Sequence, residues 1–151
     1  MVKVQKQCQC GEPMGLELRK VIYASKVEIL HVPVFSCPSC FSSEVLQHVT
    51  KDIKELLQSL GSKPAPRRIS FARNNELAEI IRKLVLEEAD NPNVDWQSAL
   101  EERMELRINL LLDLYRYARS LGDEDWMNDV EKRLVQLSGF TSKSVFTNTK
   151  N

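Results

Sequence analysis

The chain has 151 residues and a formal net charge of zero, with 21 basic and 21 acidic side chains. Its hydrophobic fraction of 42% is ordinary for a globular protein. A chain without net charge does not favour binding to DNA or to an acidic membrane through the electrostatic field of the whole protein. No apolar run approaches the roughly 20 residues of a membrane span, and the first residues lack the apolar core of an export signal. We therefore expect a cytoplasmic protein without a membrane segment.

The cysteines form two close pairs, Cys8 with Cys10 and Cys37 with Cys40, and the chain contains no others. In a reducing compartment, clustered cysteines favour a metal site over disulfides. Two such pairs, separated by about one β-hairpin, match the four tetrahedral thiolates that a structural zinc ion requires. We predict that these four cysteines bind a structural Zn²⁺. Four thiolates would leave no open coordination position for catalysis.

The short first pair leaves the fourth ligand open. A single residue separates Cys8 from Cys10, where two to four are usual. An alternative site would use the other three cysteines with His31 or His48. Lone histidines without a neighbouring histidine partner are more typical of ordinary strand or helix side chains, which favours the four-cysteine set.

Between the cysteine pairs, residues 16–23 and 26–32 are rich in β-branched and aromatic side chains and predict two strands. Ala24 and Ser25 form the predicted turn. Pro33 is expected to end the second strand because it has no N–H for the ladder. The strands and the two cysteine knuckles together predict a small zinc ribbon.

Apolar residues recur at three- and four-residue steps over residues 45–60, which predicts a trailing helix that ends at Gly61. We therefore assign residues 1–60 to a zinc-ribbon domain. Residues 61–70 contain two prolines and predict an extended linker. Its cations are candidate nucleic-acid contacts, although the neutral chain and the lack of interleaved aromatic residues do not favour this reading. These cations are Lys63, Arg67 and Arg68.

Residues 71–139 predict a helical interaction domain. Residues 75–88 have one apolar face, and residues 100–121 carry a stripe that widens around most of the helix between Ile108 and Ala118. A helix with that many apolar sides is covered by more than one neighbour, so we expect a central helix or a homodimer seam.

The start of the long helix has two candidate caps, Asp95 and a capping box at Ser98. Gly122 and Asp123 predict the turn of an antiparallel helical hairpin. The polar residues 140–151 predict a flexible tail.

No phosphate-binding loop, nucleophile elbow or zinc-protease motif is present, so we expect no enzyme. The predicted class is α+β, a zinc ribbon followed by a helical hairpin or bundle. Protein partners rank above nucleic acid, because neither helix of the hairpin shows the basic face of a DNA-reading helix.

The segment from residue 5 to residue 60 resembles the YgiT-type zinc-finger family, the N-terminal zinc module of the MqsA antitoxins and of many small bacterial proteins. In that family a Cys-x-x-Cys-Gly knuckle precedes a hairpin, and a Val-Pro pair leads into the second knuckle. This sequence departs from the pattern at Gln7, which replaces the first cysteine, and at Phe41, which replaces a glycine. The matching positions are Cys10, Gly11, Val32, Pro33, Cys37 and Cys40.

The resemblance implies a regulatory or adaptor protein with an antitoxin-like or transcription-linked role. The hairpin from Tyr115 to Leu134 also resembles the bacterial IDEAL domain, a short helical hairpin. The residues that carry this second, weaker resemblance are Ala118, Gly122, Asp123 and Trp126.

Overall fold

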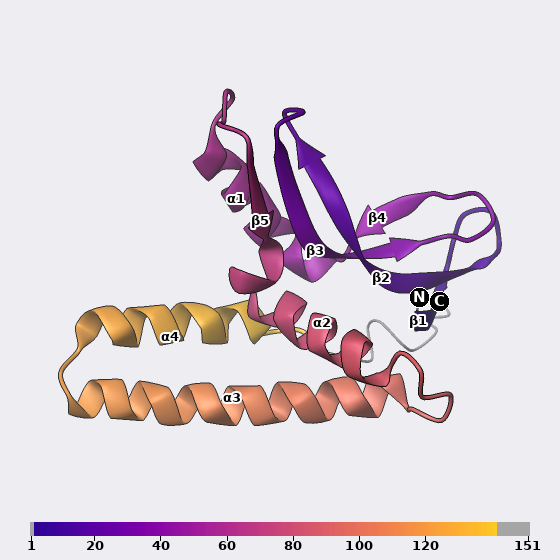
Figure 1. The fold of residues 1–151 in the computed structure, drawn as a ribbon. Helices are drawn as coiled ribbons and strands as arrows, with labels where there is room; N and C mark the ends of the chain where they lie inside the picture. Colours follow the sequence, from indigo (N-terminus) through magenta and orange to yellow (C-terminus); the bar gives the residue numbers. More distant parts are fainter. Residues whose placement is uncertain (1, 142–151) are drawn as a thin grey trace.

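The computed structural model describes residues 2–141, with side chains from residue 6 onward, and its fold class is α+β (Figure 1). The described residues contain a five-stranded sheet and four α-helices, joined by two 3₁₀ turns. The strands are β1 (Val2–Gln7), β2 (Pro13–Tyr23), β3 (Val27–Ser36), β4 (Ser43–Val45) and β5 (Arg67–Ser70). The helices are α1 (Thr50–Leu60), α2 (Glu76–Glu88), α3 (Trp96–Ser120) and α4 (Glu124–Leu137), with 3₁₀ turns η1 (Gln47–Val49) and η2 (Phe71–Arg73).

The predicted hairpin is confirmed as β2 and β3, which pair antiparallel. Ala24 and Ser25 both have positive φ, and the Lys26 N–H donates to the Tyr23 carbonyl at 3.1 Å. Two positive φ values in a two-residue turn match the right-handed twist of hairpin strands. Strand β1 is not predicted from the sequence; it pairs antiparallel with the free edge of β2.

The prediction that Pro33 ends its strand is wrong, because β3 continues to Ser36. The other edge of β3 is shared by two strands: β5 pairs parallel with residues 27–30, and β4 pairs antiparallel with residues 34–36. Pro33 lies in the interval between them, where its missing N–H costs no ladder bond on that side. Its carbonyl still accepts a hydrogen bond from the Leu46 N–H at 3.0 Å.

Part of the predicted linker is a strand. Residues 67–70 form β5, in which Ile69 pairs with Ile29 of β3. A parallel partner far away in the sequence supplies backbone hydrogen bonds that local composition does not reveal. Residues 61–66 connect α1 to β5 outside any helix or strand.

The predicted helix over residues 45–60 is shorter than expected. Residues 43–45 form β4, a 3₁₀ turn follows, and α1 begins only at Thr50. Pairing with β3 outweighs the helical pattern at Val45, which lies opposite Val34. The helix ends as predicted at Gly61, which has a φ of +77°.

The helices of the C-terminal half begin at side-chain caps. Asn75 accepts a hydrogen bond from the Ala78 N–H, Asp95 from the Ser98 N–H, and Asp123 from the Trp126 N–H. Asp95 is therefore the cap of α3, in preference to Ser98. Helices α3 and α4 run antiparallel as predicted, and α2 lies between them and the sheet (Figure 1).

Two neighbours within the chain, α2 and α4, pack against α3 as expected, but they leave part of its apolar surface exposed. The alternative of a homodimer seam stays a prediction. Leu111 and Ala118 are fully buried, but Leu112 is 36% exposed. Four further apolar side chains fall within about 60° of arc on one face, at about 100° per residue. We call this set the α3 stripe: Leu106 (62% exposed), Leu110 (48%), Tyr117 (57%) and Leu121 (59%).

The buried side chains of the sheet and of the helices form one continuous core. Ile29 of β3 and Leu77 of α2 are both completely buried within it. Phe140, assigned from the sequence to a flexible tail, is 9% exposed and packs against His48 with ring centroids 5.2 Å apart. The rest of the predicted tail, residues 142–151, lies outside the described residues. No helix among residues 2–141 has the length and apolarity to cross a membrane.

Candidate metal centre

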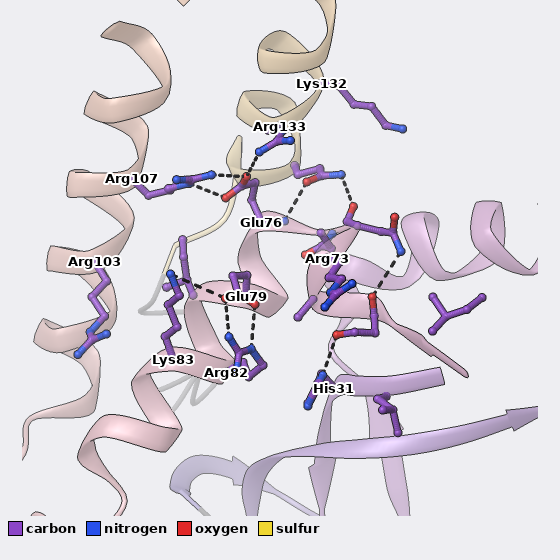
Figure 2. A pocket seen from close by; sticks show the side chains of 18 of the residues that line it. His31, Arg73, Glu76, Glu79, Arg82, Lys83, Arg103, Arg107, Lys132 and Arg133 are labelled. Carbon is purple, nitrogen blue, oxygen red and sulfur yellow. Dashed lines mark hydrogen bonds and ion pairs between the residues drawn. The ribbon is translucent and has the colours of Figure 1, made fainter. Parts of the chain in front are cut away.

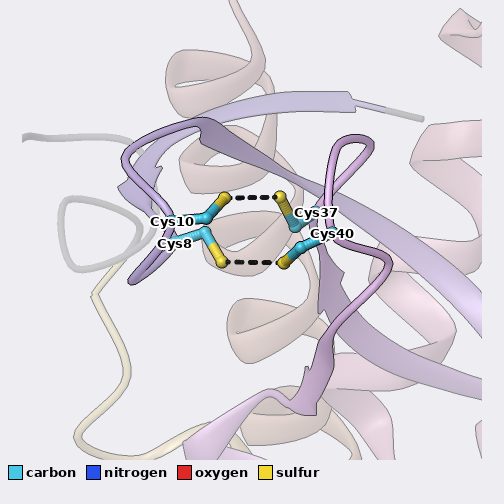
Figure 3. A group of neighbouring side chains, drawn as sticks. All are labelled: Cys8, Cys10, Cys37 and Cys40. Carbon is cyan, nitrogen blue, oxygen red and sulfur yellow. Dashed lines mark hydrogen bonds between the residues drawn. The ribbon is translucent and has the colours of Figure 1, made fainter.

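The sheet topology brings the two cysteine pairs to one place. Cys8 and Cys10 lie in the loop between β1 and β2, and Cys37 and Cys40 lie in the loop between β3 and β4. The start of β2 pairs with the end of β3 at Gly15 and Ser36, so both loops emerge at the same end of the sheet. Figure 3 shows the four side chains converging from these two loops.

The four Sγ atoms lie within 4.8 Å of one another, and all four cysteines are free of disulfides. Cys8 and Cys40 are 3.5 Å apart, and Cys10 and Cys37 are 3.4 Å apart. Thiolates bound to zinc at about 2.3 Å are about 3.8 Å from one another at the corners of a tetrahedron. The spacing of the sulfurs therefore fits one tetrahedral metal ion. A set of four sulfur ligands is typical of zinc or iron.

Each loop is closed by a backbone hydrogen bond from its first cysteine. The Cys8 N–H donates to the Glu12 carbonyl at 2.8 Å, and the Cys37 N–H donates to the Ser42 carbonyl at 2.9 Å. The first loop thus closes over one residue fewer than the second. This difference matches the missing residue between Cys8 and Cys10, and the shorter loop still directs both of its sulfurs to the common point.

The residue after each pair is in the left-handed region. Gly11 has a φ of +94° and Phe41 a φ of +62°. Glycine adopts this conformation without a steric cost, whereas a residue with a Cβ does not. The Phe41 side chain is 79% exposed, so little packing offsets the strain of its backbone.

Ser42 contacts the site and was not identified from the sequence. Its Oγ lies 3.3 Å from the Cys8 sulfur and 3.1 Å from the Cys40 sulfur. Hydrogen bonds from the side chain and backbone of Ser42 lower the pKa of Cys40 to about 6. Its position directly after the second knuckle, where a hydroxyl reaches back to a thiolate, is the signal that would have identified it.

The other two thiols with altered pKa values are those of the first loop. A hydrogen bond from the Cys10 backbone, assisted by Ser42, lowers the pKa of Cys8. The Glu12 backbone acts to lower the pKa of Cys10, but the neighbouring sulfurs, Cys37 above all, together with desolvation raise it to about 12. A metal ion must displace the remaining thiol protons, so acid weakens metal binding at such a site.

The structure places both histidines away from the cysteine cluster. His31 Nδ1 is 2.7 Å from the Ser70 hydroxyl, and His48 Nε2 is 3.0 Å from the Gln136 carbonyl. The group that can hold a metal ion contains the four cysteines and neither histidine.

The candidate nucleic-acid residues are also separate from the cysteine site. Lys63 lies exposed in the loop before β5, and Arg67 and Arg68 are exposed on β5 itself. The Arg68 guanidinium donates to Glu28 at 2.8 Å, so its charge is already partly balanced.

Comparisons with known proteins identify no relative: no family model, no curated protein and no solved structure matches the chain. The resemblance to the YgiT-type family therefore stays a prediction.

Proposed function

We propose that the protein is a non-catalytic regulatory or adaptor protein, in which a zinc ion bound by four cysteines holds the sheet and α3 binds a protein partner. The convergence of the four sulfurs carries this proposal. Four thiolate ligands satisfy a tetrahedral ion completely and leave no position for a substrate or an activated water. The metal therefore acts through structure, in an antitoxin-like or transcription-linked role of the kind that YgiT-type modules have, in a reducing compartment such as the cytoplasm.

The zinc ion would lock loops that are otherwise weakly held. Cys8, Cys10 and Cys40 are partly or fully exposed, and only Cys37 is buried within the core. The described loops have few buried side chains of their own, so a metal cross-link supplies much of their order. The two loops join β1 to β2 and β3 to β4, and the ion thereby fixes the end of the sheet.

Cysteine substitution tests the ligand set. We expect Cys8→Ser to lose stoichiometric zinc and to destabilise the sheet, because the remaining three thiolates bind the ion less tightly. Ser42→Ala and His31→Ala are matched controls, since one contacts the sulfurs without binding metal and the other is the alternative ligand. Zinc retained by Cys8→Ser and lost by His31→Ala would contradict the four-cysteine site.

The α3 stripe supports a protein partner. Four large apolar side chains on one exposed helix face form the kind of surface that binds another protein. The chain itself supplies the first candidate, a second copy paired along α3. Tyr117 also packs edge-on against Trp126 with ring centroids 5.7 Å apart, which fixes one end of the stripe.

Sedimentation equilibrium tests this partner. We expect the native chain to dimerise and the double variant Leu106→Gln/Leu121→Gln to be monomeric. Val135→Gln is the control, because Val135 is 64% exposed on α4 and does not belong to the stripe. A native monomer would contradict the homodimer and would require a different protein on this surface.

A further inference from the structure

A pocket of about 1170 Å³ lies between the sheet and the C-terminal helices, and no cysteine lines it (Figure 2). Its walls come from the β3 bulge, β5, η2, α2, α3 and α4. Sites for small molecules have volumes of about 300–1,000 Å³, so this pocket is large enough for a ligand of nucleotide size.

The pocket concentrates the positive charge of a neutral chain. Seven of the ten arginines line it, together with two lysines, against three carboxylates. These side chains come from residues 67 to 133, so the fold and not a local run of charge brings them together. In Figure 2 the labelled arginines and lysines extend from the helices and from η2, and His31 lies on the side of the sheet.

Two carboxylates hold four of the cations in place. Glu76 is nearly buried and accepts hydrogen bonds from Nε and Nη2 of Arg107 at 2.7 and 2.8 Å. The Arg133 guanidinium lies 3.5 Å from the same carboxylate. Glu79 accepts two hydrogen bonds from Arg82 and lies 3.8 Å from Lys83. Carboxylates that fix arginines in this way pre-organise them for a ligand, because less side-chain entropy remains to be lost.

Three cations remain without a charged partner among the described residues. Arg67 is on β5, Arg73 on η2 and Lys132 on α4, and all three line the pocket. Two other lining arginines are paired from outside the pocket: Arg68 with Glu28 and Arg103 with Glu87. The three cations that have no carboxylate partner in the described chain therefore lie on three different walls of the pocket.

A β-bulge in β3 contributes two of the lining residues. Leu30 and His31 lie opposite the single residue Lys20 of β2, and His31 adopts a φ of +64°. Bulges redirect side chains and are common next to binding sites. Here the bulge places the His31 ring among the pocket residues, against Ser70 of β5.

We propose that this pocket binds a small ligand with clustered phosphate groups. Guanidinium groups match phosphate oxygens in a bidentate fork, and the lining cations are mostly arginine. Three unbalanced cations correspond to the charge of a di- or triphosphate, since each phosphate group carries one to two negative charges. The proposal is independent of the zinc site. Leu106 and Leu110 belong both to the α3 stripe and to the lining of the pocket, so a partner bound along α3 would lie at the edge of this site.

A single-stranded nucleic acid fits this pocket less well. Base stacking on aromatic side chains supplies about 1–3 kcal/mol per base in single-strand binders, and no aromatic residue other than His31 lines the pocket. The zero net charge of the chain also disfavours long polyanions, which respond to the field of the whole protein.

Calorimetric titration of the zinc-loaded full chain at low salt tests the proposal. The probes are magnesium-free ATP, inorganic tripolyphosphate, adenosine and a single-stranded oligonucleotide. The test variant is Arg73→Gln/Lys132→Gln, which removes two exposed, unpaired cations. The control is Arg119→Gln/Lys54→Gln, which removes an arginine and a lysine that are exposed outside the pocket.

We expect ATP, tripolyphosphate or both to bind one site per chain. The compound with the higher affinity shows whether a nucleotide or an inorganic polyphosphate is the better ligand. The test variant should weaken binding about tenfold or more for each cation removed, the size of a charge-assisted hydrogen bond. The control variant should bind like the native chain. Absence of binding by both phosphate compounds, equal weakening in both variants, binding by adenosine at the same affinity, or tighter binding of the oligonucleotide would overturn the proposal.

Discussion

Replacing Glu76 by glutamine tests whether one carboxylate joins the three C-terminal helices. Glu76 of α2 binds Arg107 of α3 through two hydrogen bonds and lies 3.5 Å from Arg133 of α4. Its side chain is 8% exposed, whereas that of Arg107 is 30% exposed. Glutamine preserves the volume and one acceptor oxygen but removes the charge.

Breaking a fully buried ion pair costs about 3–5 kcal/mol, and the exposure of Arg107 reduces that cost by solvent screening. We therefore expect Glu76→Gln to lower the free energy of unfolding by about 2 kcal/mol. For a chain of this length, that loss lowers the melting temperature by roughly 4–8 °C. Urea unfolding followed by circular dichroism measures the change.

Glu79→Gln is the matched control. Glu79 binds Arg82 and Lys83 within its own helix, at positions three and four residues away. Pairs of this kind contribute only about 0.3–0.5 kcal/mol. Equal losses of stability in the two variants would refute the reasoning, because the contact between helices would then contribute no more than a local pair.

Two further predictions concern backbone strain and acid. Phe41→Gly should retain metal and raise the free energy of unfolding by about 1 kcal/mol in chemical denaturation. Glycine adopts the left-handed φ without strain, and the exposed ring loses no packing. A lower free energy of unfolding in the variant would show that a contact of the Phe41 ring stabilises the fold. The hydrogen bonds from Arg82 lower the pKa of Glu79 in the folded chain. The ionised carboxylate therefore stabilises the fold in full above the unfolded pKa of about 4.3. This contribution is lost as the pH falls through the lower pKa of the folded state. The stability of Glu79→Gln should accordingly depend less on pH between about 5 and 3, and parallel curves for variant and native chain would contradict this assignment.

Local signals predicted much of the fold. The cysteine spacing identified the four residues that the structure brings together, and Asp95 and Asp123 were candidates for the helix starts that they cap. Each of these signals lies within a few residues of sequence, although the two cysteine pairs that the fold brings together are 27 to 32 residues apart. The turn at Ala24 and Ser25 was predicted because these residues lie between the two predicted strands, although neither residue is a glycine or an asparagine.

The features that were missed depend on contacts between distant residues. Strand β5 carries two arginines and follows two prolines, and only its pairing with β3 makes it a strand. β3 continues through Pro33 because its two partners on that edge, β5 and β4, pair before and after this residue. The sequence around Pro33 does not reveal these two partners. The pocket is assembled from elements between Leu30 and Gln136, and its arginines, from Arg67 to Arg133, come together in a chain whose charges sum to zero.

The most direct test of the account is the metal content and coordination of the purified protein, by elemental analysis and X-ray absorption at the zinc edge. A structural site of four thiolates predicts one zinc ion per chain with four sulfur neighbours at about 2.3 Å. A protein without stoichiometric metal, or an ion with nitrogen or oxygen in place of one of the four sulfurs, would contradict it.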